Sequence, residues 1–244
     1  MEGVVVNNNV VPEIDVHRLR TSKMVLYFGI FSIIMLFAGL LSAYIITSYS
    51  ELWVSIKMPT AFYYSTAIII VSSITMALAI KASQRTGQKN AMLFLLITFG
   101  LGIGFGILQY KGWAELTGVG NYFSGSVDSL KGEYGDDYVI HYQGKELVFE
   151  DGDFYFPNDE LHEKPLFNEI AIFGNSASSY LYVLSFVHLL HVLGGLIFFI
   201  ALIVQRFSSQ IKLLRPMRMR LGGIYWNFLG GLWIFLFLFI LFIH

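Results

Sequence analysis

Long apolar stretches alternate with shorter polar segments along the chain. Five of these stretches contain no Asp, Glu, Lys or Arg. Each has roughly 20 residues or more, and at about 1.5 Å per helical residue this length crosses a hydrocarbon core of about 30 Å. Lipid offers no hydrogen bonds to an open backbone, so the pattern predicts helices. The predicted spans are residues 24–48, 60–80, 91–110, 177–204 and 222–243.

The composition strengthens this prediction. Of the 244 residues, 55% are apolar and 14% are charged, which is far from the balance of a soluble domain. The fold class predicted is an all-α integral membrane protein, a bundle of five transmembrane helices with one larger extracytoplasmic loop. The chain has no cysteine, so disulfides and thiolate metal sites are excluded. A cleavable signal peptide is not expected, because the first 23 residues are polar.

Basic residues concentrate on one side of the predicted spans. If the N-terminus is cytoplasmic, the inner segments hold 11 Lys and Arg residues and the outer segments hold 5. The positive-inside rule therefore favours a cytoplasmic N-terminus and an extracytoplasmic C-terminus. The predicted division is a cytoplasmic segment at 1–23, three spans within 24–110, an acidic extracytoplasmic loop at 111–176, and two spans within 177–244.

The predicted loop at 111–176 is strongly acidic. It holds thirteen Asp or Glu against four Lys, a local charge of -9. Such a charge can attract a basic protein or dock a neighbouring subunit, or it can simply keep a covering segment in water. Within the loop, residues 138–142 and 146–150 alternate in polarity around Gln143-Gly144-Lys145, which predicts a β-hairpin.

A few polar side chains fall inside the predicted spans: Gln109 on the third, His188 and His191 on the fourth, and Asn227 on the fifth. Polar groups in lipid are candidates for function. The two histidines are three residues apart and are expected on one helix face. They can bind a neighbouring helix or a lipid headgroup, or ligate a metal together with groups from another chain.

Other chemistry finds little support in the sequence. An i, i+3 histidine pair on one helix cannot hold haem from both faces, and the spans offer no carboxylates for a di-iron site. Phosphate-binding, nucleophile-elbow and zinc-protease motifs are missing. Proton relays and transporters normally place an acid within a span. The pattern favours an accessory subunit, and the alternative from another class is a small transporter with its site around His188 and His191.

Three of the spans resemble one family. Residues 31–44 are similar to a signature that ends in Met-Phe-Phe-Ala-Gly-Leu and Ala-Tyr. Residues 187–195 resemble the pattern Phe-His-Gly-x-His-Val-x-x-Gly, and residues 225–233 resemble Tyr-Trp-His-Phe-Val-Asp-x-x-Trp. These patterns belong to subunit III of the haem-copper terminal oxidases, in its five-helix bacterial form. The resemblance covers the spans but not the acidic loop.

The chain departs from that family at its acidic positions. Many relatives carry a buried Glu where this chain has Ile33, and a His and an Asp where it has Asn227 and Gly230. A role of that buried carboxylate therefore does not transfer to this chain.

The resemblance implies a non-catalytic subunit of cytochrome c oxidase, a proton-pumping complex that reduces O2 to water. Subunit III of that family supports subunit I, binds structural phospholipid and aids proton uptake. Haem and copper are then expected on subunits I and II and no cofactor on this chain, with the bacterial plasma membrane as its location and no nucleic acid as partner. Subunit III-like components of quinol oxidases or nitric oxide reductases remain an alternative. The residues implied as lipid, interhelical or subunit contacts are His188, His191, Tyr225, Trp226, Asn227, Trp233 and Gln109.

Overall fold

The computed structural model of the chain describes residues 3–6, 9–84, 88–159, 162–205 and 215–243. Within them, five helices are long and apolar enough to cross a membrane, so the chain is a multi-pass membrane protein and the prediction of five spans is confirmed. All five extend past their apolar runs, because helical hydrogen bonding continues into polar residues at the ends. Their bounds are α1 Glu13–Ser48, α2 Thr60–Gln84, α3 Gln88–Gly118, α5 Ser176–Gln205 and α6 Arg215–Ile243.

Some residues of the sequence predictions cannot be compared with the structure. Arg85, Arg206 and Lys212 of the predicted inner segments, and Glu160 of the acidic loop, lie outside the described residues. Before α1, strands β1 (Gly3–Val6) and β2 (Asn9–Pro12) pair antiparallel.

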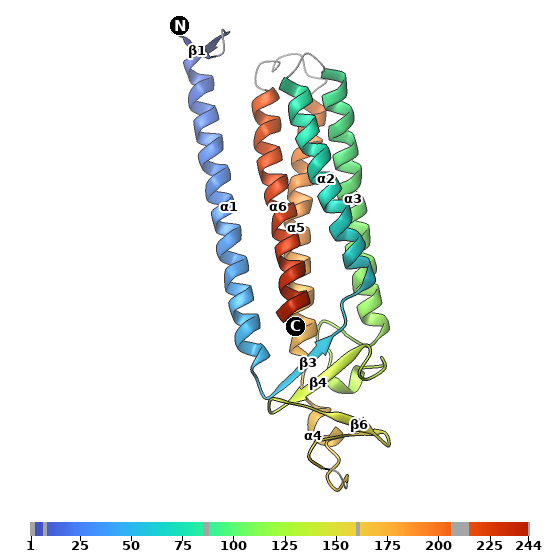
Figure 1. Ribbon diagram of the computed structural model, residues 1–244. Helices are drawn as coiled ribbons and strands as arrows, with labels where there is room; N and C mark the ends of the chain where they lie inside the picture. The colour runs from blue at the N-terminus through green and yellow to red at the C-terminus, as the bar shows by residue number, and fades with distance from the viewer. Residues whose placement is uncertain (1–2, 7–8, 85–87, 160–161, 206–214, 244) are drawn as a thin grey trace.

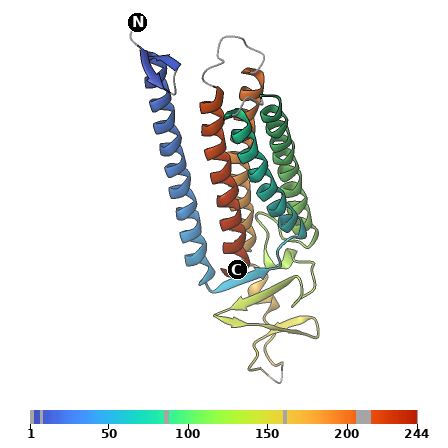
Figure 2. The ribbon, with the colours of Figure 1, turned by 45° about the horizontal axis from the view of Figure 1, so that its top comes forward.

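The helices divide into a group of four and a single helix. Helices α2, α3, α5 and α6 lie side by side, whereas α1 stands apart along most of its length (Figure 1), and a second view shows the same separation (Figure 2). From Arg20 onward, the buried residues of α1 are all in its C-terminal half: Ile33, Phe37, Leu41 and Tyr44. We call α2, α3, α5 and α6 the four-helix group.

Glycine and tryptophan let the four-helix group pack closely. Trp226 is fully buried, and a Cβ at Gly102 would lie only 2.7 Å from its ring. The same ring lies against Gly195 of α5, where a Cβ would be 3.1 Å away. Small residues allow the close helix approach on which association in lipid depends. The indole of Trp226 thus takes the space that side chains at Gly102 and Gly195 would fill.

A small β-rich cap joins the helices at the end where α1 finishes. Figure 1 shows it beyond the C-terminal ends of α1, α3 and α6. Along the chain, strand β3 comes between α1 and α2, and the rest of the cap comes between α3 and α5. Its elements are β3 (Leu52–Ile56), η1 (Val127–Ser129), β4 (Tyr138–Tyr142), β5 (Lys145–Glu146), β6 (Val148–Glu150), β7 (Asp153–Tyr155) and α4 (Phe167–Ile170).

The predicted hairpin forms only in part. Strand β4 does turn back through Gln143 and Gly144, whose φ angles of 51° and 75° suit a tight two-residue turn. The returning strand is short, because Lys145 and Glu146 pair with β4 and one further backbone hydrogen bond of 2.9 Å runs from Leu147 to Ile140. Residues 148–150 pair instead with β7 through a second turn at Asp151-Gly152, so the single long arm predicted at 146–150 is wrong. The other edge of β4 pairs with β3. Asp-Gly is itself a strong turn signal, which explains why the chain reverses there.

The cap has its own apolar core. Ile140, Leu147 and Leu166 are buried, and Tyr134 donates a hydrogen bond of 2.5 Å from its hydroxyl to the Leu147 carbonyl. Burial raises the pKa of Tyr134 to about 12, because the phenolate form is poorly solvated there. The neutral hydroxyl therefore ties the segment before β4 to the residue between β5 and β6.

Candidate functional site

Polar side chains inside the four-helix group form hydrogen bonds between neighbouring helices. The Gln109 amide of α3 donates to the Ser65 hydroxyl of α2 over 3.0 Å. His188 of α5 is fully buried, with Nε2 3.0 Å from the carbonyl oxygen of Leu229 on α6. A buried polar group in lipid is stable when it finds such a partner. Buried hydrogen bonds therefore join α2 to α3 and α5 to α6.

Two tryptophans of α6 hold the same group together. Trp226 donates from its indole nitrogen to the Ser72 hydroxyl over 2.9 Å, and Trp233 donates to Thr66 over 3.0 Å. The Trp233 ring also packs 5.1 Å from the His188 ring, centroid to centroid. Both indoles thus combine a large apolar contact with a satisfied donor, as buried tryptophans generally do.

His191 and Tyr225 occupy a different position, on the side of the group that faces α1. The Tyr225 hydroxyl donates to the His191 carbonyl over 3.2 Å. The His191 ring bonds through Nδ1 to the Val187 carbonyl of its own helix and lies 6.0 Å from the Phe37 ring of α1. The two histidines predicted to share a face nevertheless have different neighbours, since residues three apart lie about 60° apart around the helix axis.

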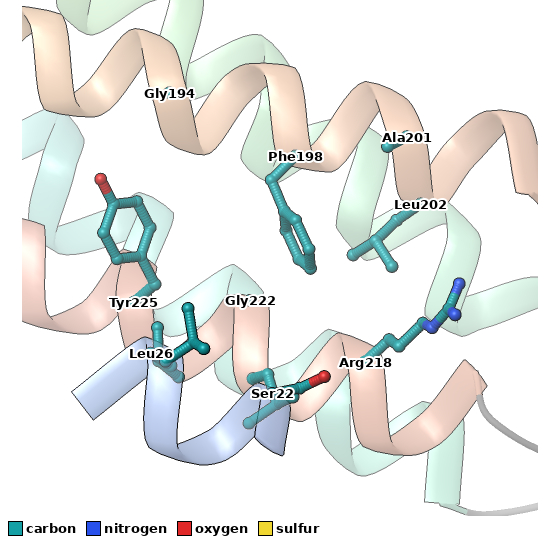
Figure 3. Close-up of a pocket in the computed structure, with 11 residues that line it drawn as sticks. Ser22, Leu26, Gly194, Phe198, Ala201, Leu202, Arg218, Gly222 and Tyr225 are labelled. Carbon is teal, nitrogen blue, oxygen red and sulfur yellow. The ribbon is translucent and has the colours of Figure 1, made fainter. Parts of the chain in front are cut away.

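A pocket lies where α1 stands away from α5 and α6. It has a volume of about 500 Å³, and Figure 3 shows side chains from all three helices around it. Arg218 extends from α6 toward α5, and Tyr225 lies at the other end of the labelled residues (Figure 3). The lining residues are Ser22, Val25, Leu26, Gly194, Phe198, Ala201, Leu202, Arg218, Leu221, Gly222 and Tyr225.

The chemistry of this pocket suits an amphipathic anion. Most of its lining is aliphatic or aromatic, while Arg218 supplies a permanent positive charge with several donors. Ser22 of α1 adds a hydroxyl to the lining. An acyl chain can lie against the apolar wall, and a guanidinium binds phosphate and carboxylate groups through paired hydrogen bonds. The lining therefore combines an apolar surface with an anion-binding group.

Gly222 and Phe198 show why the pocket has room between α5 and α6. A Cβ at Gly222 would lie 2.5 Å from the Phe198 ring, so a larger residue there would push that ring out of place. The predicted site residues differ in whether they line the pocket. Tyr225 lines it, whereas Gln109, His188, Trp226 and Trp233 are buried inside the four-helix group.

Asn227 lies apart from all of these contacts. Its side chain is exposed on α6 and makes no hydrogen bond within the part of the chain that the structure describes. An amide is costly to leave unpaired in hydrocarbon. Asn227 is therefore the predicted site residue whose side chain lies at the surface of the bundle.

The acidic residues of the cap are mostly at its surface. Lys57 pairs with Asp136 over 3.6 Å, and Lys164 pairs with Glu169 over 3.1 Å. Asp159 accepts backbone N–H groups from Glu163 and Lys164, and these hydrogen bonds lower its pKa. The described residues contain no cluster of three His, Cys, Asp or Glu side chains that could hold a metal.

Sequence reasoning missed Arg218 and Ser22 as pocket residues. Both lie near the ends of spans, and in the sequence analysis Arg218 was used only as one of the basic residues that predict the orientation of the chain. The available signal was the position of Arg218 seven residues before Tyr225, which places the two on one side of α6.

The three motif segments come together in the structure although they are far apart in the chain. Phe37, His191 and Tyr225 each come from a different motif and are linked by the ring contact and hydrogen bond described above. No protein-family model matches the chain, and a search of curated proteins gives no match. The family resemblance therefore rests on the motif residues alone.

Proposed function

We propose that this chain is subunit III of a bacterial haem-copper terminal oxidase, a non-catalytic partner of a cytochrome c oxidase that reduces O2 to water and pumps protons. The observation that carries the proposal is the meeting of the three resembling motifs at Phe37, His191 and Tyr225. Helix packing alone does not require three family-like segments to meet at one place. Their convergence beside the pocket supports a shared role.

The role proposed for the chain is to hold phospholipid beside subunit I. The pocket between α1, α5 and α6 supports this role, because it joins an apolar wall to the charge of Arg218. A lipid held there has its headgroup at the Arg218 end, which is the N-terminal end of α6. With the N-terminus in the cytoplasm, as the basic residues favour, that end faces the cytoplasmic leaflet.

Contacts with partner subunits are proposed for two surfaces. Asn227 on the exposed side of α6 can donate to and accept from a helix of subunit I, since interhelical hydrogen bonds hold membrane subunits together. The acidic cap lies on the extracytoplasmic side in this orientation. There it either attracts a basic cytochrome c or covers the adjacent subunit II.

Affinity purification of the tagged chain from its own membranes in mild detergent tests the proposal. We expect subunits I and II to co-purify, and the preparation to show the absorption spectrum of haem. A tag on a different five-span protein from the same membranes is the control. A stable preparation of the chain without haem protein would contradict the proposal.

The same purification distinguishes cytochrome c oxidase from the alternative complexes. A partner with a quinol-oxidising subunit II, or one with nitric oxide reductase activity, would identify the alternative complex. Flux of a solute through liposomes that contain the chain alone, abolished by His188→Ala, would instead support the transporter hypothesis.

A further inference from the structure

The amide of Gln109 is held in one orientation. The Ser65 hydroxyl lies 2.9 Å from the Phe62 carbonyl and donates its proton there, because a carbonyl oxygen can only accept. The Ser65 oxygen must then accept the bond of 3.0 Å from Gln109. Nε2 of Gln109 is therefore the donor, and the remaining group, Oε1, is an acceptor. It is buried and has no partner among the described residues.

The ring of His188 is held in one tautomer by the same reasoning. Its Nε2 lies 3.0 Å from the Leu229 carbonyl oxygen, which can only accept, so Nε2 carries the proton. In the neutral ring Nδ1 is then an acceptor. Like Oε1 of Gln109, it is buried without a partner in the described part of the chain. Two unsatisfied acceptors are thus present in the interior of the four-helix group.

Gln109 and His188 lie at the same level of the neighbouring helices α3 and α5. One turn after Gln109, Trp113 donates to Ser185 of α5 over 2.9 Å. One turn before Gln109, the Phe105 ring contacts the His188 ring with centroids 5.6 Å apart. These two contacts between α3 and α5 bracket Gln109, and His188 lies within one turn of Ser185. Gln109 and His188 therefore share one layer of the bundle.

We propose that an internal water molecule binds between Gln109 and His188, donating one O–H to Gln109 Oε1 and the other to His188 Nδ1. Two acceptors cannot bond to each other, and a water molecule is the smallest group that brings two donors. Buried waters commonly satisfy polar groups that the protein leaves unpaired. The result is a continuous chain of hydrogen bonds from Ser65 through Gln109, water and His188 to Leu229. It joins α2, α3, α5 and α6, and it does not depend on the function proposed above.

Solid-state NMR of the full-length chain in lipid bilayers, with ¹⁵N-labelled histidine, tests the proposal. The His188 signals are assigned from their loss in His188→Phe. We expect Nδ1 of His188 to be unprotonated, shifted from the position of an unbonded nitrogen, and to show magnetisation transfer from water. The proposal would be overturned if Nδ1 of His188 were protonated, had the chemical shift of an unbonded nitrogen, or received no magnetisation from water. These signals are measured on the unmodified chain, so this result does not depend on how the variants behave.

Replacement of Gln109 tests the bridge itself. Gln109→Met keeps a similar length but removes the acceptor, so we expect the His188 Nδ1 shift to move toward the unbonded value and the water transfer to be lost. Gln84→Met, at an exposed glutamine at the end of α2, is the matched control and should change neither signal. An unchanged Nδ1 signal in a folded Gln109→Met protein would show that no water joins the two residues.

An independent measurement uses infrared spectra in H₂¹⁶O and H₂¹⁸O. A single buried water gives a sharp O–H band that shifts with the oxygen isotope. We expect this band in the unmodified chain and in Gln84→Met, and its loss in Gln109→Met. A band that persists in Gln109→Met would place the water elsewhere and overturn the proposed site.

Discussion

Helices α1 and α6 are both long and apolar, yet they differ in how much of their surface is buried against other helices. In the apolar window of α6, 39% of the residues are buried, against 17% in that of α1. Helix α6 carries Trp226 and Trp233, whose rings pack onto small or aromatic residues of the other helices. The buried residues described on α1 are confined to one half. Hydrophobicity alone therefore takes a helix into the membrane, while glycine, hydroxyl and indole groups decide how tightly it joins its neighbours.

The first prediction compares a large side chain from each helix. Trp226→Ala removes a fully buried indole and should lower the free energy of unfolding by about 3–5 kcal/mol, because a cavity remains and the bond to Ser72 is lost. Phe28→Ala on α1, where the ring is 68% exposed, should change it by less than about 0.5 kcal/mol. Reversible unfolding in mixed micelles, followed by circular dichroism, measures both. Equal losses would remove the distinction between the two helices.

The second prediction replaces a glycine in each region. A side chain at Gly102 would overlap the Trp226 and Leu196 side chains, whereas Gly29 of α1 has no heavy atom within 4 Å of its Cβ position. Gly102→Leu should destabilise the protein by about 1–3 kcal/mol through overpacking, and Gly29→Leu should have little effect. The unfolding midpoint in mixed micelles checks this. A neutral Gly102→Leu would mean that the four-helix group packs loosely at this point.

The third prediction concerns the pocket that separates α1 from α6. A charge-assisted hydrogen bond contributes about 1.5–3 kcal/mol, so Arg218→Gln should weaken the binding of an anionic phospholipid at least about tenfold. Arg220→Gln, at the exposed residue two positions later, is the matched control. Native mass spectrometry with added phosphatidylglycerol measures both affinities. Equal weakening by the two variants would point to general surface charge instead of the pocket.

The fourth prediction concerns the cap, to which α1 connects through β3. The pKa of Tyr134 is raised from 10.0 to about 12 in the folded chain, so its contribution to stability is complete below pH 10 and is lost as the pH rises through 12. We expect α1 to become more mobile between these values while the four-helix group stays folded. The change should be smaller in Tyr134→Phe, which has no phenol to titrate at this position.

The chain has no cysteine, so spin labels at Phe28→Cys and Arg220→Cys can report the distance between α1 and α6. The distance distribution should broaden on raising the pH through this range. Tyr49→Phe, at a tyrosine that is 87% exposed, is the control and should retain the full broadening. A distribution that is the same at pH 9 and pH 12 would contradict the link between the cap and α1.

The sequence predicted the helices well because lipid imposes a simple rule. A run of about 20 apolar residues without charge has one stable form in hydrocarbon, and each of the five predicted runs lies within a helix of the structure. Their ends were harder to predict, since Glu13 and Gly118 show that helices continue beyond the apolar region. Polar residues there remain helical at little cost.

The cap and the pocket could be predicted only in part, because they depend on contacts between distant segments. The turn at Gln143-Gly144 was identified from local pattern, but the Asp151-Gly152 turn was overlooked although it carries a stronger local signal. The pairing of β3 with β4 has no local signal at all. The same holds for the pocket, since nothing in the sequence around Ser22 and Arg218 indicates that α1 and α6 line one pocket there.

The pairing of β3 with β4 has a consequence for how the chain is made. Leu52 pairs with Tyr142, so a ribosome that has just completed β3 must translate two more helices before its partner strand exists. During that interval the open edge of β3 is available to other strands, including those of a chaperone or a second copy. The strand that follows the first helix is thus made early but gains its partner late, after the third helix has been translated.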